Sequence, residues 1–452
     1  MKYRVINSHD VLKVNRFDGS YHNAEVNVYD EIIKSHSDHN LTYYCSTIFT
    51  SGRARRMYTK QEFGYPFFSN ADVASQNPLS ACNYASKKYS YDETAFLKGG
   101  MLLTGRVGAI GQTSFVPKFW ERYGMMGSDN IIRIVVKPEH KNGFIYAYLA
   151  SKVGNLSFWK HATGGVQPFI TDKMVGNLPI PNFPDSFQKE VDDLIQQSAT
   201  LREQAAAKLD EAHAIIDKEF SIAAKPKDNK TSVKSIVNSH TTRFEGSYYT
   251  SSNRSLYDYV IKNYAYKPLK DCTDRIFRPG IFKREYVSRG VPFLGGADIM
   301  MAIPKSDKNL SFKQVLRMPE LQVQKGWILV TCGGTIGNTV YVDNQISKCV
   351  VSQHVMRVVP KEDTLNGYLY AFLSSKIGHE LITLFTYGSV IPSVEAHHLE
   401  KVPIPLLDEE KTKYIDELIQ SYVENLEVSK LKETLAITMV EEEIEKWQSP
   451  TA

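Results

Sequence analysis

Residues 143–154 have the sequence GFIYAYLASKVG, and residues 367–378 have the sequence GYLYAFLSSKIG. The two stretches match position by position at an offset of 367 − 143 = 224 residues. The tetrapeptides LPIP at 178–181 and VPIP at 402–405 stand at the same offset. A constant offset over separate blocks indicates that the second half of the chain is a copy of the first.

Further matching blocks extend the repeat toward the start of each half. Offsets of 226 or 227 relate four pairs of segments: 16–21 and 243–248, 66–68 and 292–294, 100–103 and 326–329, and 110–111 and 336–337. The repeated unit is about half of the 452 residues. Because solenoid repeats are only about 20–45 residues long, the pattern predicts a duplicated globule rather than a solenoid.

A long polar stretch with apolar residues three and four positions apart closes each half. This spacing predicts amphipathic helices, and two such helices in one chain are expected to pack as an antiparallel coiled coil. The predicted domains are a first globule at 1–184, a central spacer helix at 185–222, a second globule at 223–407 that begins with a linker at 223–242, and a C-terminal spacer helix at 408–452.

Each globule is predicted to be α/β mixed (α+β). Short apolar runs predict buried strands at 101–104, 131–136, 328–331 and 355–359, and buried helices are predicted at 144–152 and 368–376. Gly100 and Gly105 have the spacing of a phosphate-binding loop, but Arg106 follows where that loop needs Lys. A structural turn is therefore the favoured interpretation of this glycine-rich segment.

Bulk properties restrict the class of protein. The formal net charge of +4 is weakly basic and does not by itself imply a nucleic-acid partner. The five cysteines form no CxxC pair, which argues against a zinc site or a disulfide framework and favours a reducing, cytoplasmic setting. No apolar run approaches the roughly 18 residues of a membrane span, so no membrane partner is expected.

Two clusters of basic residues stand at equivalent places among turn-prone and aromatic residues. The first cluster precedes residues 66–68 and consists of Arg53, Arg55, Arg56 and Lys60. At an offset of 228 the second half carries Lys283 and Arg284, and Arg289 follows shortly before residues 292–294. With Arg106 of the glycine-rich turn, the candidates for DNA contact are Arg53, Arg55, Arg56, Lys60, Arg106, Lys283, Arg284 and Arg289. Such side chains suit phosphate contacts and guanine edges, although the local pattern fits a solvated surface loop equally well.

The sequence lacks the motifs of an enzyme. No HExxH motif and no Asn/Asp-Pro-Pro-aromatic tetrad of an amino-methyltransferase is present, since residues 77–79 lack the second proline and the ring. Asp18 and Glu245 are matched acids, interpreted as cap or ion-pair partners. Residues without a copy in the other half are interpreted as surface or structural groups: His36, His39, His397, His398, Cys332 and Cys349. We expect no catalytic residue, no metal site and no cofactor in this chain.

The order of these motifs resembles the specificity (S) subunit of type I restriction-modification systems. The resemblance rests on RFDGSY and RFEGSY, the apolar strand before each glycine-rich turn, the repeated helix of the opening stretch, GGVQP at 164–168 with GSVIP at 388–392, and Pro-Ile-Pro before each long helix. Each motif is weak alone. Their order, repeated twice, covers nearly the whole chain.

The resemblance implies that each globule is a target-recognition domain for one half of a split double-stranded DNA sequence. The helices would fix the spacing and help dock methyltransferase (M) subunits, which methylate adenine with S-adenosylmethionine. Restriction (R) subunits, where present, would add ATP- and Mg-dependent cleavage. In the family a segment ahead of the first globule helps complete the helix arrangement, and this sequence offers little there. Base-contacting residues vary within the family, so none is carried over.

Two other functions stay open. A type IIB-like methylase-nuclease could use the same two-domain reader, and a neighbouring reading frame that fuses methylase and nuclease would indicate it. A coiled-coil scaffold without DNA contact would lack the steep salt dependence of phosphate binding. The globules differ most in their front halves, for instance 80–94 against 306–319. This difference favours the reading of an asymmetric split target.

Overall fold

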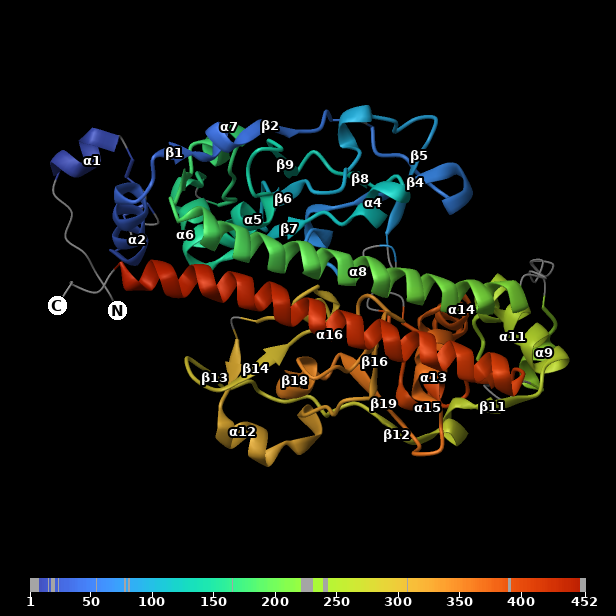
Figure 1. Ribbon diagram of the computed structural model, residues 1–452. Coiled ribbons are helices and arrows are strands. Elements are labelled where there is room, and N and C mark those ends of the chain that lie inside the picture. Colours follow the sequence, from blue (N-terminus) through green and yellow to red (C-terminus); the bar gives the residue numbers. More distant parts are fainter. Residues whose placement is uncertain are drawn as a thin grey trace. The chain divides into compact units, whose positions relative to one another are not determined.

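The computed structural model describes residues 8–14, 16–17, 21–22, 24–53, 55–76, 79, 82–164, 166–220, 231–238, 243–306, 308–388 and 392–447. The chain forms two compact units, Met1–Glu203 with Val428–Ala452 and Gln204–Glu427 (Figure 1). Asp18, residues 77–78 and most of the predicted linker, 223–230 and 239–242, lie outside the described residues.

Two four-stranded sheets organise the first unit. The central sheet has the order β2-β9-β6-β7 and consists of β2 (Cys45–Thr50), β9 (Ile131–Val136), β6 (Leu102–Gly105) and β7 (Thr113–Phe115), all antiparallel. The outer sheet has the order β3-β5-β4-β8 and consists of β3 (Tyr58–Thr59), β5 (Asn83–Ser86), β4 (Gly64–Phe68) and β8 (Met126–Gly127), in which β4 and β8 are parallel. A short pair joins β1 (His39–Asn40) to β10 (Pro179–Ile180).

The helices of the first unit are short until the chain leaves the globule. They are α1 (Ser8–Val14), α2 (Ala24–Ser35), α3 (Leu41–Tyr44), α4 (Lys118–Arg122), α5 (Asn142–Ala150), α6 (Lys152–His161) and α7 (Asp172–Gly176). Helix α5 packs against β7 of the central sheet (Figure 1). Its residues from Gly143 to Leu149 are all buried, which is why this stretch is apolar on every side.

The second unit repeats the topology strand for strand. Its central sheet is β12 (Thr273–Phe277), β19 (Val355–Pro360), β16 (Ile328–Thr331) and β17 (Thr339–Tyr341), and its outer sheet is β13 (Tyr286–Val287), β15 (Asn309–Leu310), β14 (Val291–Leu294) and β18 (Val350–Val351). β11 (Tyr266–Pro268) pairs with β20 (Pro403–Pro405). The helices are α9 (Val233–Val237), α10 (Gly246–Thr250), α11 (Ser252–Asn263), α12 (Phe312–Arg317), α13 (Asn366–Ser374), α14 (Lys376–Leu384) and α15 (Ala396–Leu399).

The mixed α and β character predicted for each half is confirmed, and one detail of the helices was wrong. Strands β9 and β16 coincide with the predicted 131–136 and 328–331. The helices predicted at 144–152 and 368–376 instead end at Ala150 and Ser374. Ser151 and Ser375 have extended backbones, and each hydroxyl caps the next helix by accepting the amide of Gly154 or Gly378, both at 3.1 Å.

Two long helices follow the globules. Helix α8 (Asp185–Glu219) has 35 residues and α16 (Glu409–Lys446) has 38. Each helix contributes one half to each unit. In the first unit Arg202 pairs with Glu433, and in the second Lys411 Nζ lies 2.7 Å from Glu219 Oε2. None of the helices in the described residues combines the length and apolar character needed to cross a membrane.

The same anchor attaches a long helix to the globule that precedes it. Asp192 Oδ1 accepts the amide of Gly143 at 2.7 Å, and Asp416 Oδ1 accepts the amide of Gly367 at 2.7 Å. Each carboxylate therefore satisfies a free N–H at the start of α5 or α13 and lies near the positive end of the helix dipole.

The opening Arg-Phe motif closes another helix in both units. Arg16 Nη2 donates to the carbonyl of Ala162 at 2.6 Å, just after α6, and Arg243 Nη2 donates to Thr386 at 2.7 Å, just after α14. A guanidinium satisfies the free carbonyls at a helix C-terminus. Glu245 forms an ion pair with Arg243, in agreement with the structural role expected of it.

Candidate nucleic-acid interface

A turn that joins the outer sheet to the central sheet lies at the centre of each candidate site. In the first unit it spans 128–131, between β8 and β9, and in the second it spans 352–355, between β18 and β19. Ser128 Oγ accepts the amide of Asn130 at 3.2 Å, and Ser352 Oγ accepts the amide of His354 at 3.1 Å. The two turns are thus built alike.

A fully buried arginine braces each turn. Arg133 on β9 and Arg357 on β19 are both 0% exposed. The Nη1 of Arg133 donates to Ser128 O at 3.3 Å and Ile131 O at 2.8 Å, and the Nη1 of Arg357 donates to Ser352 O at 2.9 Å and Val355 O at 2.6 Å. Burial lowers the pKa of each guanidinium to about 10, so both remain charged at neutral pH.

The same two guanidiniums connect the turn to the outer sheet. Arg133 Nη2 donates to the carbonyl of Gly127 on β8 at 2.5 Å, and Arg357 Nη2 donates to the carbonyl of Val351 on β18 at 2.5 Å. A cation buried without a carboxylate partner is costly unless its donors are satisfied. Here backbone carbonyls accept from the Nη1 and Nη2 donors of both guanidiniums, whereas each buried Nε has no hydrogen-bond partner. The carbonyl contacts hold the backbone of the turn on either side of its tip residue.

In the first unit, that tip residue is Asp129, and the side chains of two arginines contact it. Arg56 forms an ion pair with Asp129, and Arg53 Nε lies 3.5 Å from Asp129 Oδ2. The guanidinium carbon of Arg56 also lies 5.8 Å from the centroid of the Phe67 ring on β4. Arg56 is therefore held between a carboxylate and an aromatic face.

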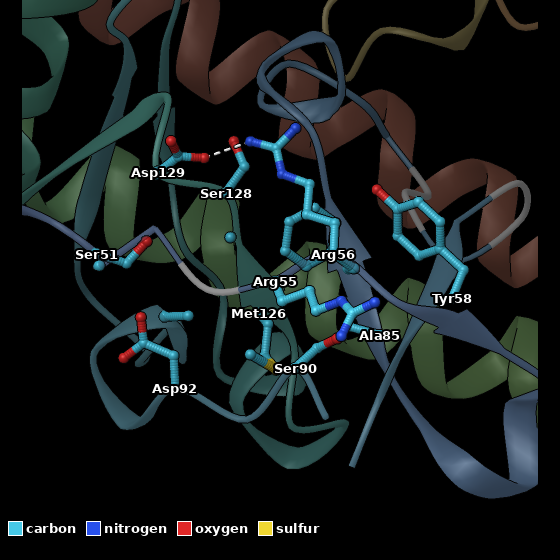
Figure 2. A pocket seen from close by; sticks show the side chains of 14 residues that line it. Ser51, Arg55, Arg56, Tyr58, Ala85, Ser90, Asp92, Met126, Ser128 and Asp129 are labelled. Atoms are coloured by element: carbon cyan, nitrogen blue, oxygen red, sulfur yellow. Dashed lines mark hydrogen bonds and ion pairs between the residues drawn. The ribbon is translucent and has the colours of Figure 1, made fainter. Parts of the chain in front are cut away.

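A pocket lies beside this pair. Its lining residues include Arg55, Arg56, Tyr58, Asp92 and Asp129. Figure 2 shows Arg56 extended toward Asp129, whereas Arg55 extends toward Ala85 and Ser90. Both exposed arginines thus contribute to the lining of this pocket.

The remaining two candidates of the first unit lie at different distances from the turn. The amide of Arg106 donates to the carbonyl of Asn130 at 2.9 Å, so the residue is adjacent to the turn. Lys60 follows β3 at the edge of the outer sheet and is exposed. The structure therefore brings the side chains of Arg53 and Arg56 to the turn and places the backbone of Arg106 beside it. Arg55 lines the pocket, and Lys60 stays at the sheet edge.

In the second unit, Arg284 occupies the place of Arg56. Its guanidinium carbon lies 5.3 Å from the centroid of the Phe293 ring on β14. Its Nη2 donates to Gln353 Oε1 at 3.4 Å, and Gln353 is the tip residue of the 352–355 turn. The cation again lies between an aromatic face and the turn, but its partner is a neutral amide.

The other candidates of the second unit surround Arg284. Gln314 on α12 donates to the carbonyl of Lys283 at 2.7 Å and accepts the amide of Glu285 at 2.9 Å. This buried amide fixes the backbone on both sides of Arg284. Arg289 lies between β13 and β14 and is exposed.

Sequence reasoning missed the partners of these arginines. Asp129, Gln353 and Gln314 were not singled out, because nothing local links them to the basic clusters. Arg133 and Arg357 were missed as well, although a signal existed. Each is the lone charged residue of an apolar strand, and the two stand at the repeat offset of 224.

The side chains considered for other chemistry are engaged in the fold. The His36 ring stacks on Trp447 with centroids 4.2 Å apart, and the His39 ring stacks on Tyr43 at 3.7 Å. Burial lowers the pKa of His398 to about 4 and raises the pKa of the Cys332 and Cys349 thiols to about 11. A thiol of raised pKa is a poor nucleophile. Among the described residues, no group of three or more His, Cys, Asp or Glu side chains could hold a metal ion.

Comparison with known proteins adds one family match. Residues 282–438 match the family model described as Type I restriction modification DNA specificity domain. This segment includes Lys283, Arg284, Arg289, Gln353 and Arg357. No curated protein sequence matches the chain.

Two solved structures are similar to the chain at low identity. The S subunit of the type I restriction-modification system from M. genitalium has 13% identity and a TM-score of 0.32, over 91% of this chain and 96% of that one. The HsdS subunit from Thermoanaerobacter tengcongensis has 14% identity and a TM-score of 0.28, over 89% and 95%. TM-scores at this level do not establish a shared fold.

Proposed function

We propose that this chain, of which residues 282–438 match the type I restriction modification DNA specificity domain model, is the DNA-recognition subunit of a type I restriction-modification system. The family match confirms, for this segment, the resemblance that the sequence motifs predicted. The globules at 1–184 and 223–407 are assigned as two target-recognition domains, each for one half of an asymmetric bipartite duplex sequence.

The observation that carries the proposal is the duplicated site. Each unit has the same outer sheet, the same turn braced by a buried arginine, and an exposed arginine over the ring of Phe67 or Phe293. Arginine donors match guanine O6 and N7 in the major groove and also phosphate oxygens. Two similar readers with different neighbours around the arginine suit a target of two unlike halves.

The long helices are proposed as the spacer between the two halves of the target. As helices of 35 and 38 residues they measure about 52 Å and about 57 Å, and successive major grooves on one face of B-DNA are about 34 Å apart. We further propose that the antiparallel pair they form docks methyltransferase subunits. Exposed Leu431 and Leu435 on α16 are available for such a contact.

Catalysis is assigned to partner subunits. Methyltransferase (M) subunits would bind S-adenosylmethionine, and restriction (R) subunits would bind ATP and Mg. This chain would contribute double-stranded DNA recognition. Its described cysteines are buried or half-buried, which supports a recognition role over a nucleophilic one.

An exchange of globules tests the proposal. Residues 1–184 are replaced with the same domain of a relative, and the full chimeric chain is purified with its M subunit. Sequencing of the methylated adenines in host DNA then gives the recognised motif. We expect one half of the motif to change and the other to persist, and the exchange of residues 223–407 to change the opposite half. A change of both halves, or of neither, contradicts the modular assignment.

Salt dependence separates the proposal from the scaffold alternative. Binding of the full chain with its M subunit to a random-sequence duplex library is measured over a range of salt concentrations. Phosphate neutralisation predicts a linear fall of log K with log salt, with a slope near −0.9 per phosphate contacted. No salt-dependent DNA binding would favour a scaffold. A fused methylase-nuclease in the neighbouring reading frame would favour the type IIB-like alternative.

A further inference from the structure

We infer that Asp129 and Gln353, the tip residues of the two turns, are the specificity-determining pair that makes the two globules treat DNA differently. Asp129 holds Arg56 in an ion pair, whereas Gln353 offers Arg284 a neutral amide oxygen. Both act as positioning residues, through the arginine that each contacts. This inference rests on the proposed function and assigns the origin of the asymmetry to one position of the repeat.

The equivalence of the two positions follows from the strand register. Phe67 on β4 pairs with Met126 on β8, and Phe293 on β14 pairs with Val350 on β18, both in parallel. Three residues after Met126 comes Asp129, and three residues after Val350 comes Gln353. The two tip residues therefore stand at the same place relative to the aromatic ring under each arginine.

The backbone around the two positions is built alike. The amide of Ser128 donates to the carbonyl of Phe68 at 2.9 Å, and the amide of Ser352 donates to the carbonyl of Leu294 at 2.9 Å. The buried arginine of each central sheet holds the rest of the turn. The backbone, the ring and the brace are repeated, and the tip side chain differs where it contacts the guanidinium of Arg56 or Arg284 directly.

The difference changes the charge that DNA meets. The side chain of Asp129 is 14% exposed and faces both Arg53 and Arg56, so the pair shares one negative charge. When a phosphate or a base approaches, it competes with the carboxylate of Asp129 for the donors of the Arg56 guanidinium. Gln353 is 5% exposed and offers Arg284 only an amide oxygen at 3.4 Å. The tip of this turn therefore supplies no negative charge that would compete with DNA for Arg284.

Two opposite substitutions exploit this difference. Asp129→Asn removes the competing carboxylate while keeping the side-chain shape, and Gln353→Glu introduces one beside Arg284. Each is tested in the full chain with its M subunit, on a duplex that carries both half-sites and on duplexes in which one half-site is scrambled. The domain exchange described above assigns each half-site to its globule.

We expect Asp129→Asn to tighten binding and to steepen the salt slope by about 1, because one more cation becomes available to phosphate. Discrimination against base changes in the first half-site should fall about tenfold, because the freed arginine loses its fixed direction. Gln353→Glu should weaken binding and flatten the slope by about 1. Its effect on base discrimination should be confined to the second half-site.

Matched controls change charge away from the turns. Glu139→Gln removes an exposed carboxylate beyond the C-terminal end of β9, whereas Asp129 precedes the N-terminal end of that strand. Gln324→Glu adds a carboxylate at an exposed position ahead of the start of β16, whereas the turn of Gln353 lies beside the other end of that strand. The inference is overturned if the tip variants match these controls in salt slope and half-site preference, while the wild-type complex binds DNA with a normal salt slope. If the wild-type complex shows no such binding, the proposed function itself fails. Circular dichroism of each variant reports folding, and either tip substitution alone decides the outcome if the other unfolds.

Discussion

Arg202 on α8 forms an ion pair with Glu433 on α16, and their side chains are only 14% and 6% exposed. At the repeat offset of 224, the equivalent positions in the second unit are Leu426 and Leu209, which are both buried. Equivalent positions of α8 and α16 are therefore occupied by an ion pair in the first unit and by two leucines in the second. Tyr146 donates to Glu433 Oε1 at 2.5 Å and extends the polar cluster.

Removal of one partner of this pair should be worse than removal of both. Glu433→Leu leaves Arg202 buried without a counter-ion, and we expect a loss of about 3–5 kcal/mol in the free energy of unfolding. The double substitution Arg202→Leu with Glu433→Leu recreates the apolar pair of the second unit. It should restore most of that loss, because a well-packed apolar pair of similar volume is often neutral or stabilising.

Urea unfolding of the full chain, followed by circular dichroism, measures this prediction. Lys413→Leu serves as a control, since it breaks an exposed i,i+4 pair with Glu409 on α16. That control should leave the free energy of unfolding close to that of the wild type, because solvent screens an exposed ion pair. A double variant no more stable than Glu433→Leu alone would contradict this prediction. It would mean that the polar cluster stabilises the fold by more than the pairing of its two charges.

Gly367 should tolerate no side chain. A Cβ at this position would lie 2.6 Å from Asp416 Oδ1 and 2.9 Å from Asp416 O. Gly367→Ala should therefore push α16 away from α13 and cost about 1–3 kcal/mol of unfolding free energy. Gly246→Ala is the matched control, because a Cβ there meets no atom within 4 Å. Equal stability of the two alanine variants would contradict this account of the anchor.

The repeat carried most of what the sequence could tell about the fold. Matching blocks predict one topology twice, and the apolar runs at 131–136 and 328–331 predict β9 and β16 because those strands are buried along most of their length. The break at Ser151 was missed, since a serine within an apolar run reads as a tolerated helix residue. Its capping role is visible only in the structure, where α5 ends at Ala150 and α6 begins at Lys152.

The candidate site could be predicted only in part. Arg56 and Arg284 stand out as basic residues at corresponding places. Asp129 lies 73 residues from Arg56 in the sequence and reaches it through the parallel pairing of β4 with β8. Local patterns do not contain such long-range pairings, so the partner that sets the charge of each arginine could not be found from sequence alone.

Arg357 should be as important for stability as an apolar core residue. Arg357→Met removes the donors that satisfy the carbonyls of Ser352, Val355, Val351 and Leu321. Since hydrogen bonds to charged groups each contribute about 1.5–3 kcal/mol and not all will be lost at once, we expect a cost of about 3–5 kcal/mol. Thermal or urea unfolding measures it.

Arg317 provides the comparison for Arg357. Its side chain is 56% exposed and pairs with Glu285 at 3.1 Å. Arg317→Met should cost under about 1 kcal/mol. If Arg357→Met were equally mild, the braced turn would be stable without its arginine, and the positional argument for Gln353 would lose its support.

His213 should make the stability of the second unit depend on pH. Its Nε2 lies 3.0 Å from Ser374 Oγ, and burial lowers the pKa of the imidazole from 6.5 to about 4. The unfolded chain therefore binds more protons than the folded one between these two values. Stability should be fully present above pH 6.5 and fall as pH drops toward 4, by about 1–3 kcal/mol for this residue.

The substitution His213→Gln isolates this contribution. The glutamine keeps a polar group near Ser374 but cannot titrate, so the free energy of unfolding should change less between about pH 7 and about pH 4.5 than in the wild type. Some dependence should remain, because burial also lowers the pKa of His398 to about 4. Urea midpoints at both pH values give the comparison. The same pH dependence in both proteins would mean that His213 is protonated in the folded state, and that water reaches the imidazole between α8 and the end of α13.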